Sequence, residues 1–400
     1  MIPAAVGRGM DRRSFVRTSG LAALGLAFGG CATRSSRVQT APAPSHRPMV
    51  ELPAVHVAWD RVIRTTVGLR PHRPLGFVLK ADKLDDTLLI HNYGHGGSGW
   101  SLSWGTGYMA CEMALASGHR RAAVIGCGIV GLNTARLLQR RGFETTIYAK
   151  SVPPDTTSNM ALAGWTPTSG LVEFGKQTPE WTAQFVRAAE IAYRHWQLLV
   201  GPQNGISWTV NYTPTDDEAM ARGENQLLPE HMKDAQDVLG PGEHPFPMKF
   251  AIRRSMMRFE PSIYLDVALR DFMLFGGKLV IRTFASPREF AALSEPVIVN
   301  CTGLGSRDLF DDQELVPLKG QLVVLVPQPE VNYGTNGGLH TQLNTPGGFL
   351  HMMPRSDGII LGGTSIKGDW SLEPSEEDRK RVVERHIELY AAMRGATAHT

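Results

Sequence analysis

The residues best suited to binding a phosphorylated ligand form a glycine-rich turn, Gly126-x-Gly128-x-x-Gly131. In such a turn the first glycine permits a sharp change of direction, and the second lets backbone N–H groups approach a pyrophosphate. The third glycine allows the following helix to pack closely on the preceding strand. We predict that this turn binds a dinucleotide through Gly126, Gly128, Ile129, Val130 and Gly131.

One position departs from the usual dinucleotide pattern. The second strand of such a unit normally ends in an acidic residue that accepts hydrogen bonds from a ribose, and that position here is Lys150. Lysine cannot accept a hydrogen bond. It either donates to a ribose hydroxyl, pairs with a phosphate or points into solvent. The substitution argues against a plain NAD site.

A second glycine-rich loop, HNYGHGGSG, occupies residues 91–99. It follows a predicted strand, 86–90, and leads into a predicted helix, 102–115. A glycine-rich turn that enters a helix directs N–H groups and the positive end of the helix dipole toward an anionic or electron-rich ligand. A single histidine here would normally be a core or capping residue, but packing alone does not explain nine positions so dense in Gly, His, Asn and Tyr. We predict ligand contacts by His95, Gly96, Gly97, Ser98 and Gly99.

These loops need elements to position them, and the sequence around the first loop supplies a strand–turn–helix–strand unit. Residues 122–125 and 144–148 are predicted strands, and apolar residues from Ile129 to Leu138 recur at helical spacing before Gly142. A GxGxxG motif inside such a unit is far more specific than the motif alone. Further helices are predicted at 179–200, 262–275 and 375–394, and further strands at 205–212, 248–252, 278–283, 318–326 and 358–361. This pattern indicates an α/β fold.

Length and composition limit the class of protein. Four hundred residues suggest two or three structural units. With 20% charged residues and a formal net charge of +3, the chain is neither intrinsically disordered nor built around a large cationic surface for nucleic acid. Its cysteines, Cys31, Cys111, Cys127 and Cys301, are too widely spaced for a disulfide framework or a C-x-x-C metal pair, so we expect no metal site.

The first 50 residues are typical of an export leader. A paired arginine in DRRSFVR (11–17) precedes a short, weakly hydrophobic run that ends near Cys31, the order found in twin-arginine signal peptides. We predict a signal peptide over 1–32 and a flexible linker over 33–50. Gly29-Gly30-Cys31 also resembles a lipobox. The mature protein is therefore expected in the periplasm, either cleaved after Ala32 or anchored to the membrane as a lipoprotein through Cys31.

Five segments of the chain point to one family. They are VGLRPHRP (67–74), HNYGHGGSG (91–99), TTSNMALAGW (156–165), VIVNCTGLGS (297–306) and LGGTSIKGDW (361–370). Together they resemble the D-amino-acid oxidase family, which binds FAD, and the resemblance covers residues 55–395. It implies further FAD contacts by Thr156, Thr157, Ser158, Gly164 and Gly303.

The resemblance also implies the fold. We expect a Rossmann-like FAD-binding domain (73–160 and 261–311) interleaved with an α+β substrate domain on an antiparallel or mixed sheet (51–72, 161–260 and 312–400). The family places the Rossmann glycines first and the GLRP and HNYGHGG segments last, whereas this chain reverses the order. We therefore predict a circular permutation in which the helix 375–394 finishes beside a strand starting near Val55.

The implied activity is the FAD-dependent oxidative deamination of a D-amino acid. A hydride moves from Cα to flavin N5, water hydrolyses the imino acid, and oxygen is reduced to hydrogen peroxide. We expect Arg70 to bind the substrate carboxylate bidentately. We expect His351, which stands where the family has a tyrosine, to contact the substrate. Ser365 stands where D-aspartate oxidases carry an arginine, so an acidic substrate is disfavoured unless Arg355 replaces that arginine.

Two alternative functions stay open. One is a flavin dehydrogenase of secondary or imino amino acids that donates electrons to a quinone, and the other is a catalytically inactive exported flavoprotein. The expected partners are a small-molecule D-amino acid, oxygen or another electron acceptor, and a second copy of the chain as a homodimer. No nucleic-acid partner is expected.

Overall fold

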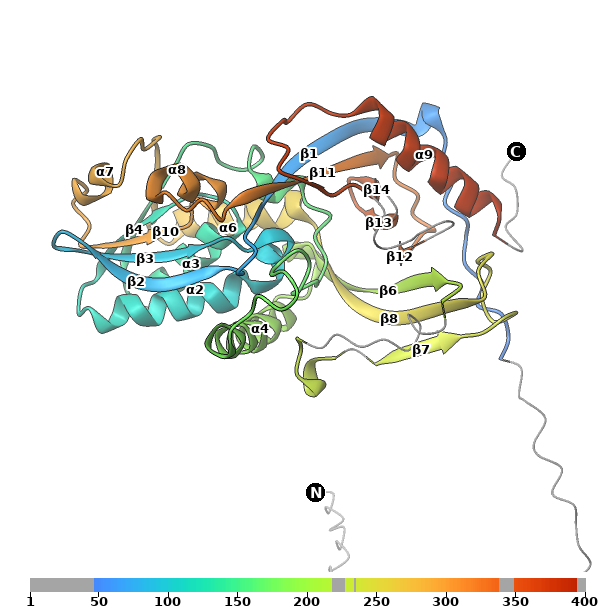
Figure 1. The fold of residues 1–400 in the computed structure, drawn as a ribbon, viewed down its shortest axis with the longest axis horizontal. Helices are drawn as coiled ribbons and strands as arrows, with labels where there is room; N and C mark the ends of the chain where they lie inside the picture. The colour runs from blue at the N-terminus through green and yellow to red at the C-terminus, as the bar shows by residue number, and fades with distance from the viewer. Residues whose placement is uncertain (1–46, 218–226, 234, 338–348, 394–400) are drawn as a thin grey trace, which may run out of the picture. The chain divides into compact units, whose positions relative to one another are not determined.

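Two β-sheets with helices packed against them make up the computed structural model, which describes residues 47–217, 227–233, 235–337 and 349–393 (Figure 1). The predicted signal peptide 1–32, Cys31 included, and the linker up to residue 46 lie outside the described residues. Residues from Arg47 onward belong to one compact unit. Within the described part of the chain, no helix combines the length and the apolar character that a membrane span requires.

The first sheet has six strands in the order β2-β3-β10-β4-β5-β9. The strands are β2 (Val78–Leu84), β3 (Thr87–Tyr93), β4 (Arg121–Ile125), β5 (Glu144–Ala149), β9 (Lys278–Ile281) and β10 (Val297–Asn300). Pairing is parallel from β3 to β9, and β2 is antiparallel to β3. The side chains of β4 are apolar on both faces: Ala122 and Val124 belong to one hydrophobic core, Ala123 and Ile125 to another. A parallel sheet buried on both faces is the setting that a dinucleotide-binding turn requires.

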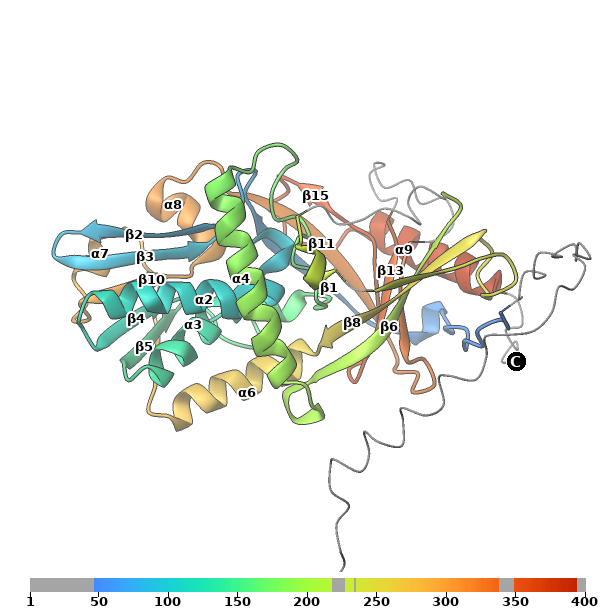
Figure 2. The same ribbon diagram turned by 90° about the horizontal axis from the view of Figure 1, so that it is seen from below.

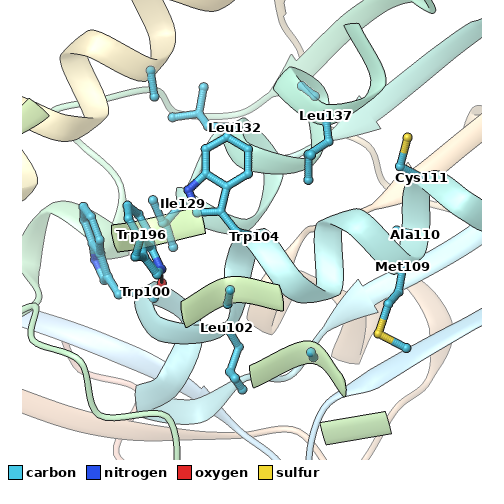
Figure 3. Close-up of a cluster of buried hydrophobic side chains, with 14 of the residues drawn as sticks. Trp100, Leu102, Trp104, Met109, Ala110, Cys111, Ile129, Leu132, Leu137 and Trp196 are labelled. Carbon is cyan, nitrogen blue, oxygen red and sulfur yellow. Dashed lines mark hydrogen bonds between the residues drawn. The ribbon is translucent and has the colours of Figure 1, made fainter. Parts of the chain in front are cut away.

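Helices cover both faces of this sheet (Figures 1 and 2). On one face lie α2 (Gly99–Ala116), α3 (Ile129–Arg140), α4 (Pro179–Leu198) and α6 (Pro261–Leu274), which share a core that contains Trp100, Trp104 and Trp196 (Figure 3). The short helices α7 (Arg288–Ala291) and α8 (Ser306–Phe310) pack on the other face. The 3-10 helices are η1 (Trp59–Arg61), η2 (Gly96–Ser98), η3 (Thr157–Met160), η4 (Pro202–Asn204), η5 (Glu230–Met232) and η6 (Gly303–Gly305).

The second sheet has nine strands, eight of them in the order β1-β11-β14-β13-β12-β6-β8-β7, with β15 also paired to β11. Its strands are β1 (Val62–His72), β6 (Ile206–Thr215), β7 (Gln236–Leu239), β8 (Phe250–Phe259), β11 (Val316–Leu325), β12 (Tyr333–Asn336), β13 (His351–Arg355), β14 (Gly358–Gly362) and β15 (Ile366–Lys367). Pairing is antiparallel except between β12 and β6. Helix α9 (Glu376–Ala391) shares a hydrophobic core with β11 and β14.

The secondary structure predicted around the first glycine turn is confirmed, as are the long helices α4, α6 and α9. The predicted length of one strand, β8, was wrong, and several short strands were not predicted. β8 continues to Phe259, well beyond the predicted 248–252, because it pairs with β6 along its whole length. The short strands β2, β7 and β12 were not predicted, since few of their residues carry a clear hydrophobic alternation.

Both sheets draw their strands from separate parts of the chain. The six-stranded sheet uses strands from 73–160 and 261–311, and the nine-stranded sheet uses the remaining segments. Helix α4 does not follow this division, because it belongs to the predicted substrate segment but packs against α2 beside the first sheet. The division into two domains stays a prediction.

The two ends of the described chain meet in one hydrophobic core. Val55 and Val57 share this core with Val382, Leu389 and Tyr390 of α9. At the other junction, only residues 117–120 separate α2 from β4. The predicted strand near Val55 was wrong, since Val55 lies in irregular chain and the first strand, β1, begins at Val62. The permutation itself stays a prediction.

Candidate active site

A cavity of about 1590 Å³ is lined by residues of both sheets. Its walls include the turn after β4, the loop before α2, the segments after β5 and β10, and parts of β1, β11 and β13. Pockets for small molecules are typically about 300–1,000 Å³. The cavity is therefore large enough for a dinucleotide together with a small substrate.

The first glycine turn forms one wall of this cavity. Gly126 has a φ of +118°, and a β-carbon there would lie 2.5 Å from the carbonyl oxygen of Cys301. A β-carbon at Gly131 would lie 2.1 Å from the carbonyl oxygen of Gly126. Helix α3 begins at Ile129 without a cap from its own N-cap residue. The N–H of Ile129 donates to Ser158 Oγ at 2.9 Å, which leaves the next N–H groups, those of Val130 and Gly131, to face an anion. All five predicted residues of this turn line the cavity.

The second glycine loop forms the adjoining wall. A β-carbon at Gly96 would lie 1.9 Å from the carbonyl oxygen of Gly170, and one at Gly97 would lie 2.7 Å from that of Ser169. Helix α2 also begins without a side-chain cap. Two helix N-termini and two glycine cradles in one cavity fit FAD, which combines an anionic pyrophosphate with a ring that gains negative charge when it is reduced.

Most of the remaining predicted cofactor residues also line the cavity. They are His95, Gly99, Lys150, Thr156, Thr157, Ser158, Gly164 and Gly303. Lys150 is exposed at the carboxyl end of β5. His95 is buried, its Nε2 lies 3.0 Å from Thr106 Oγ1, and burial lowers its pKa to about 3. The imidazole of His95 is therefore neutral, and its partner is a side chain of α2.

Ser98 is the one predicted residue that does not line the cavity. Its hydroxyl donates to the carbonyl oxygens of Thr166 and Ser169, at 3.2 and 3.0 Å. A direct ligand contact by Ser98 stays a prediction, and its hydroxyl is engaged by the chain itself. The side chain turns away from the cavity because it bonds to the segment that follows Gly164.

Arg70 projects from β1 into the cavity. Its Nε donates to the carbonyl oxygen of Leu318 at 3.0 Å, and its Nη2 donates to Ser365 Oγ at 3.0 Å and the carbonyl oxygen of Thr364 at 3.4 Å. Burial alone lowers the pKa of Arg70 to about 10, and no carboxylate of the described residues pairs with it. The guanidinium is thus held by neutral groups with one nitrogen, Nη1, left for an anionic ligand.

His351 begins β13 and lines the same cavity as Arg70. Burial, followed by the charges of His386 and Arg70, lowers the pKa of His351 to about 3. Its Nε2 has no hydrogen-bond partner among the described residues. His351 is therefore a neutral imidazole near the Arg70 guanidinium, with its Nε2 buried against Gly362 of β14, where a β-carbon would lie 2.0 Å from that nitrogen.

The alternative anchor for an acidic substrate, Arg355, is occupied. Its Nε and Nη2 donate to the two carboxylate oxygens of Asp357 at 2.8 and 2.9 Å, and its Nη1 donates to the carbonyl oxygen of Ala161 at 3.0 Å. Arg355 does not line the cavity. The possibility that it holds a second substrate carboxylate was therefore wrong.

Sequence reasoning missed several residues of the cavity wall. Met256 and Met353 approach Gly164, where a β-carbon would lie 3.2 and 3.6 Å from their methyl carbons. Gln321 and Arg282 also line the cavity. Arg282 was detectable, because it directly follows a parallel strand and ligand contacts gather at the carboxyl ends of such strands. The other three belong to antiparallel strands that carry no motif.

Comparison with known proteins agrees with this geometry. The family model described as FAD dependent oxidoreductase (DAO) matches residues 121–399, beginning at the first residue of β4. The D-amino-acid oxidase of Dictyostelium discoideum is 28% identical over 278 residues, which cover 66% of this chain and 70% of that protein. The D-amino-acid oxidase of Rubrobacter xylanophilus is 29% identical over 279 residues, covering 69% and 79%.

Among solved structures, the L-proline dehydrogenase from P. horikoshii matches with a TM-score of 0.47 and 16% identity, over 68% of this chain and 77% of that one. The family match spans more than half of the chain, and it includes the turn, the helix and the strand that form the dinucleotide wall. The protein belongs to the DAO family of FAD-dependent oxidoreductases and acts on amino acids with FAD as its cofactor.

Proposed function

We propose that the protein catalyses the oxidative deamination of D-amino acids that carry a single carboxylate. The observation that carries this proposal is the Arg70 guanidinium, which faces the FAD cavity without a carboxylate partner among the described residues. Similar proteins are named D-amino-acid oxidases. The carboxylate of a bound amino acid would pair with this guanidinium.

The chain's own residues hold the two reactants. The turn 126–131 and residues 156–158 would bind the FAD pyrophosphate through backbone N–H groups and hydroxyls, and the loop 95–99 would lie against the flavin. Bound flavin supplies the capacity to accept a hydride from the substrate Cα. Arg70 binds the carboxylate and so fixes the position of that carbon.

The site needs no proton shuttle of its own. Because its pKa is lowered to about 3, His351 is neutral at any pH near 7. In that form it can donate or accept a hydrogen bond with the substrate, but it does not carry charge. Its role is to orient the substrate next to Arg70.

The two positions considered for a second substrate carboxylate, 355 and 365, supply no free cation. Arg355 is paired with Asp357, and Ser365 is uncharged. The nearest apolar wall is formed by Met256 and Met353. We therefore expect neutral D-amino acids to be oxidised faster than D-aspartate or D-glutamate.

Anaerobic mixing of the FAD-loaded protein with single D-amino acids tests this proposal. Loss of flavin absorbance with neutral D-amino acids, and a slower loss with D-aspartate, is the expected result. No loss with any D-amino acid would contradict the proposal and favour the inactive flavoprotein. Peroxide formed on readmission of oxygen identifies an oxidase, whereas reduction of a quinone without peroxide identifies a dehydrogenase.

We also propose export by the twin-arginine route, followed by a periplasmic or lipid-anchored location. Support comes from the paired Arg12 and Arg13 ahead of a short hydrophobic run that ends near Cys31. Replacing both arginines by lysine should leave the protein in the cytoplasm, and Cys31→Ala should release a membrane-bound form. Continued export of the lysine variant would contradict the route.

We infer, finally, that the chain is a circular permutation of the family order. The family match begins at Arg121, although the segments VGLRP and HNYGHGG lie before that residue. The first and last described segments share a core, and residues 117–120 bridge the junction between α2 and β4. Both features suit a chain whose original ends were joined at 117–120.

A further inference from the structure

Trp196 of α4 is fully buried and lies outside the cavity lining. Its indole Nε1 donates to the carbonyl oxygens of Trp100 and Ser101, at 3.2 and 3.1 Å. Both acceptors belong to the first turn of α2, where the second glycine loop becomes a helix. The indoles of Trp196 and Trp100 stack with their centroids 6.2 Å apart (Figure 3).

Two further hydrogen bonds lead from this turn toward the wall around the first glycine turn. Trp100 Nε1 donates to the carbonyl oxygen of Ser158 at 3.0 Å, and Ser158 Oγ accepts from the backbone N–H of Ile129 at 2.9 Å. The N-termini of α2 and α3 are thereby joined through Ser158. Trp100, Ser158 and Ile129 all line the cavity.

A second branch runs from Ser101 to the segment after η3. Ser101 Oγ accepts from the backbone N–H of Thr166 at 2.8 Å and lies 3.4 Å from the carbonyl oxygen of Gly164. Gly164 and Thr166 also line the cavity. The indole of Trp196 therefore contacts the first turn of α2, from which both sets of hydrogen bonds begin.

The carbonyl groups that Trp196 contacts sit inside a helix, where each already has an N–H partner four residues later. The bonds from Trp196 are not needed to satisfy them, so their effect is to fix how the turn is oriented. We propose that Trp196 is a positioning residue for the FAD site, acting through Trp100 and Ser101 on both helix N-termini. The inference concerns the cofactor and is independent of the proposed substrate.

The test replaces the indole N–H while keeping the size of the ring. Trp196 is substituted by 3-benzothienyl-alanine, in which sulfur takes the place of the N–H, and FAD binding to the cofactor-free protein is measured. We expect the Kd for FAD to rise about tenfold, because the first turn of α2 is no longer held in the orientation that binds the cofactor. The visible circular dichroism of the bound flavin should also change, while the melting temperature of the cofactor-free protein stays near that of the wild type.

Trp104 provides the matched control. It lies in the same core and is 2% exposed, and its indole nitrogen interacts with the side chain of Tyr264 rather than with a carbonyl of the first turn of α2. The same substitution at Trp104 should leave the Kd for FAD and the flavin dichroism unchanged. An unchanged Kd for the Trp196 variant, or equal losses at both positions, would overturn the proposal and leave Trp196 an ordinary core residue. Substitution at both Trp196 and Trp100 should reduce the free energy of FAD binding by less than the sum of the two single reductions, because the two residues act in series.

Discussion

Arg70 reaches the cavity with a guanidinium that uncharged groups of the described chain hold in place. Its place in VGLRP indicated a carboxylate ligand, but the motif says nothing about what holds the guanidinium. The structure supplies two carbonyl oxygens and a hydroxyl, all uncharged. A cation held by neutral groups in a cavity keeps its attraction for an incoming anion, since no carboxylate in the described part of the chain pairs with it.

Replacing Arg70 by lysine should preserve the charge and remove the paired N–H groups. We expect KM for a neutral D-amino acid to rise about 100-fold, within the range for truncating one partner of a buried charged pair. The Kd for FAD should stay unchanged, because the glycine turns are untouched. Steady-state kinetics and FAD titration measure the two effects. A rise in the Kd for FAD equal to the rise in KM would show that Arg70 supports the fold rather than the substrate.

Four histidines whose pKa is strongly lowered by burial predict an unusual acid sensitivity. Burial lowers the pKa of His95 and His351 to about 3, and that of His91 and His386 to about 4. In the unfolded chain these imidazoles take up protons near pH 6.5. Between that pH and the lowered pKa values of the folded state, the unfolded chain therefore binds more protons than the folded chain. Stability should therefore fall as the pH drops below about 6.5, by at most about 1.4 kcal/mol per histidine per pH unit.

Urea unfolding at pH 7 and pH 5 measures this loss. The variant His386→Gln, which removes one buried imidazole, should lose less stability over the same interval. His119→Gln, at an exposed position, should behave as the wild type does. Equal losses in all three proteins would refute the assignment to buried histidines.

At the scale of elements, the sequence predicted what depends on local pattern. The unit β4–α3–β5 was predicted to within a residue or two, because the glycine turn, the helical spacing and the two apolar strands all point to the same structure. The antiparallel strands were harder, since β8 owes its length to pairing with β6, which its own residues do not reveal. The same limit explains why Met256 and Gln321 were missed in the site while the glycine turns were found.

The glycine turn itself provides a test at this scale. In Gly131→Ala the new methyl group would lie 2.1 Å from the carbonyl oxygen of Gly126, so the turn must move away from α3. We expect the Kd for FAD to rise at least tenfold, with a loss of stability of about 1–3 kcal/mol from the overpacked contact. In the control Gly118→Ala the methyl group meets nothing within 4 Å, and only the strain of a φ of +77° remains. FAD binding that survives Gly131→Ala would contradict the predicted cradle.

For the whole molecule, the proposed permutation makes a direct prediction. A rearranged chain that begins at Arg121, joins residue 393 to residue 50 through a flexible glycine–serine linker and ends at Ser117 restores the family order. Because the two ends already share a core, it should fold and bind FAD with a Kd close to that of the original chain. A chain opened instead between Val323 and Val324, inside β11, serves as the disrupted control. Failure of the first chain to fold would count against the permutation.

The pairing of β1 with β11 also bears on how the protein is made. Arg70 bonds to a residue 248 positions later in the chain, and β3 cannot enter its sheet before β10 has been synthesised. At about 5–20 residues per second, the strand that carries Arg70 waits roughly 12–50 s for its partner. The six-stranded sheet cannot be completed before Asn300 has been made, and the nine-stranded sheet not before Lys367, so both close late, through contacts of high sequence separation. We therefore expect slow maturation and a strong dependence on chaperones, both set by strand order alone.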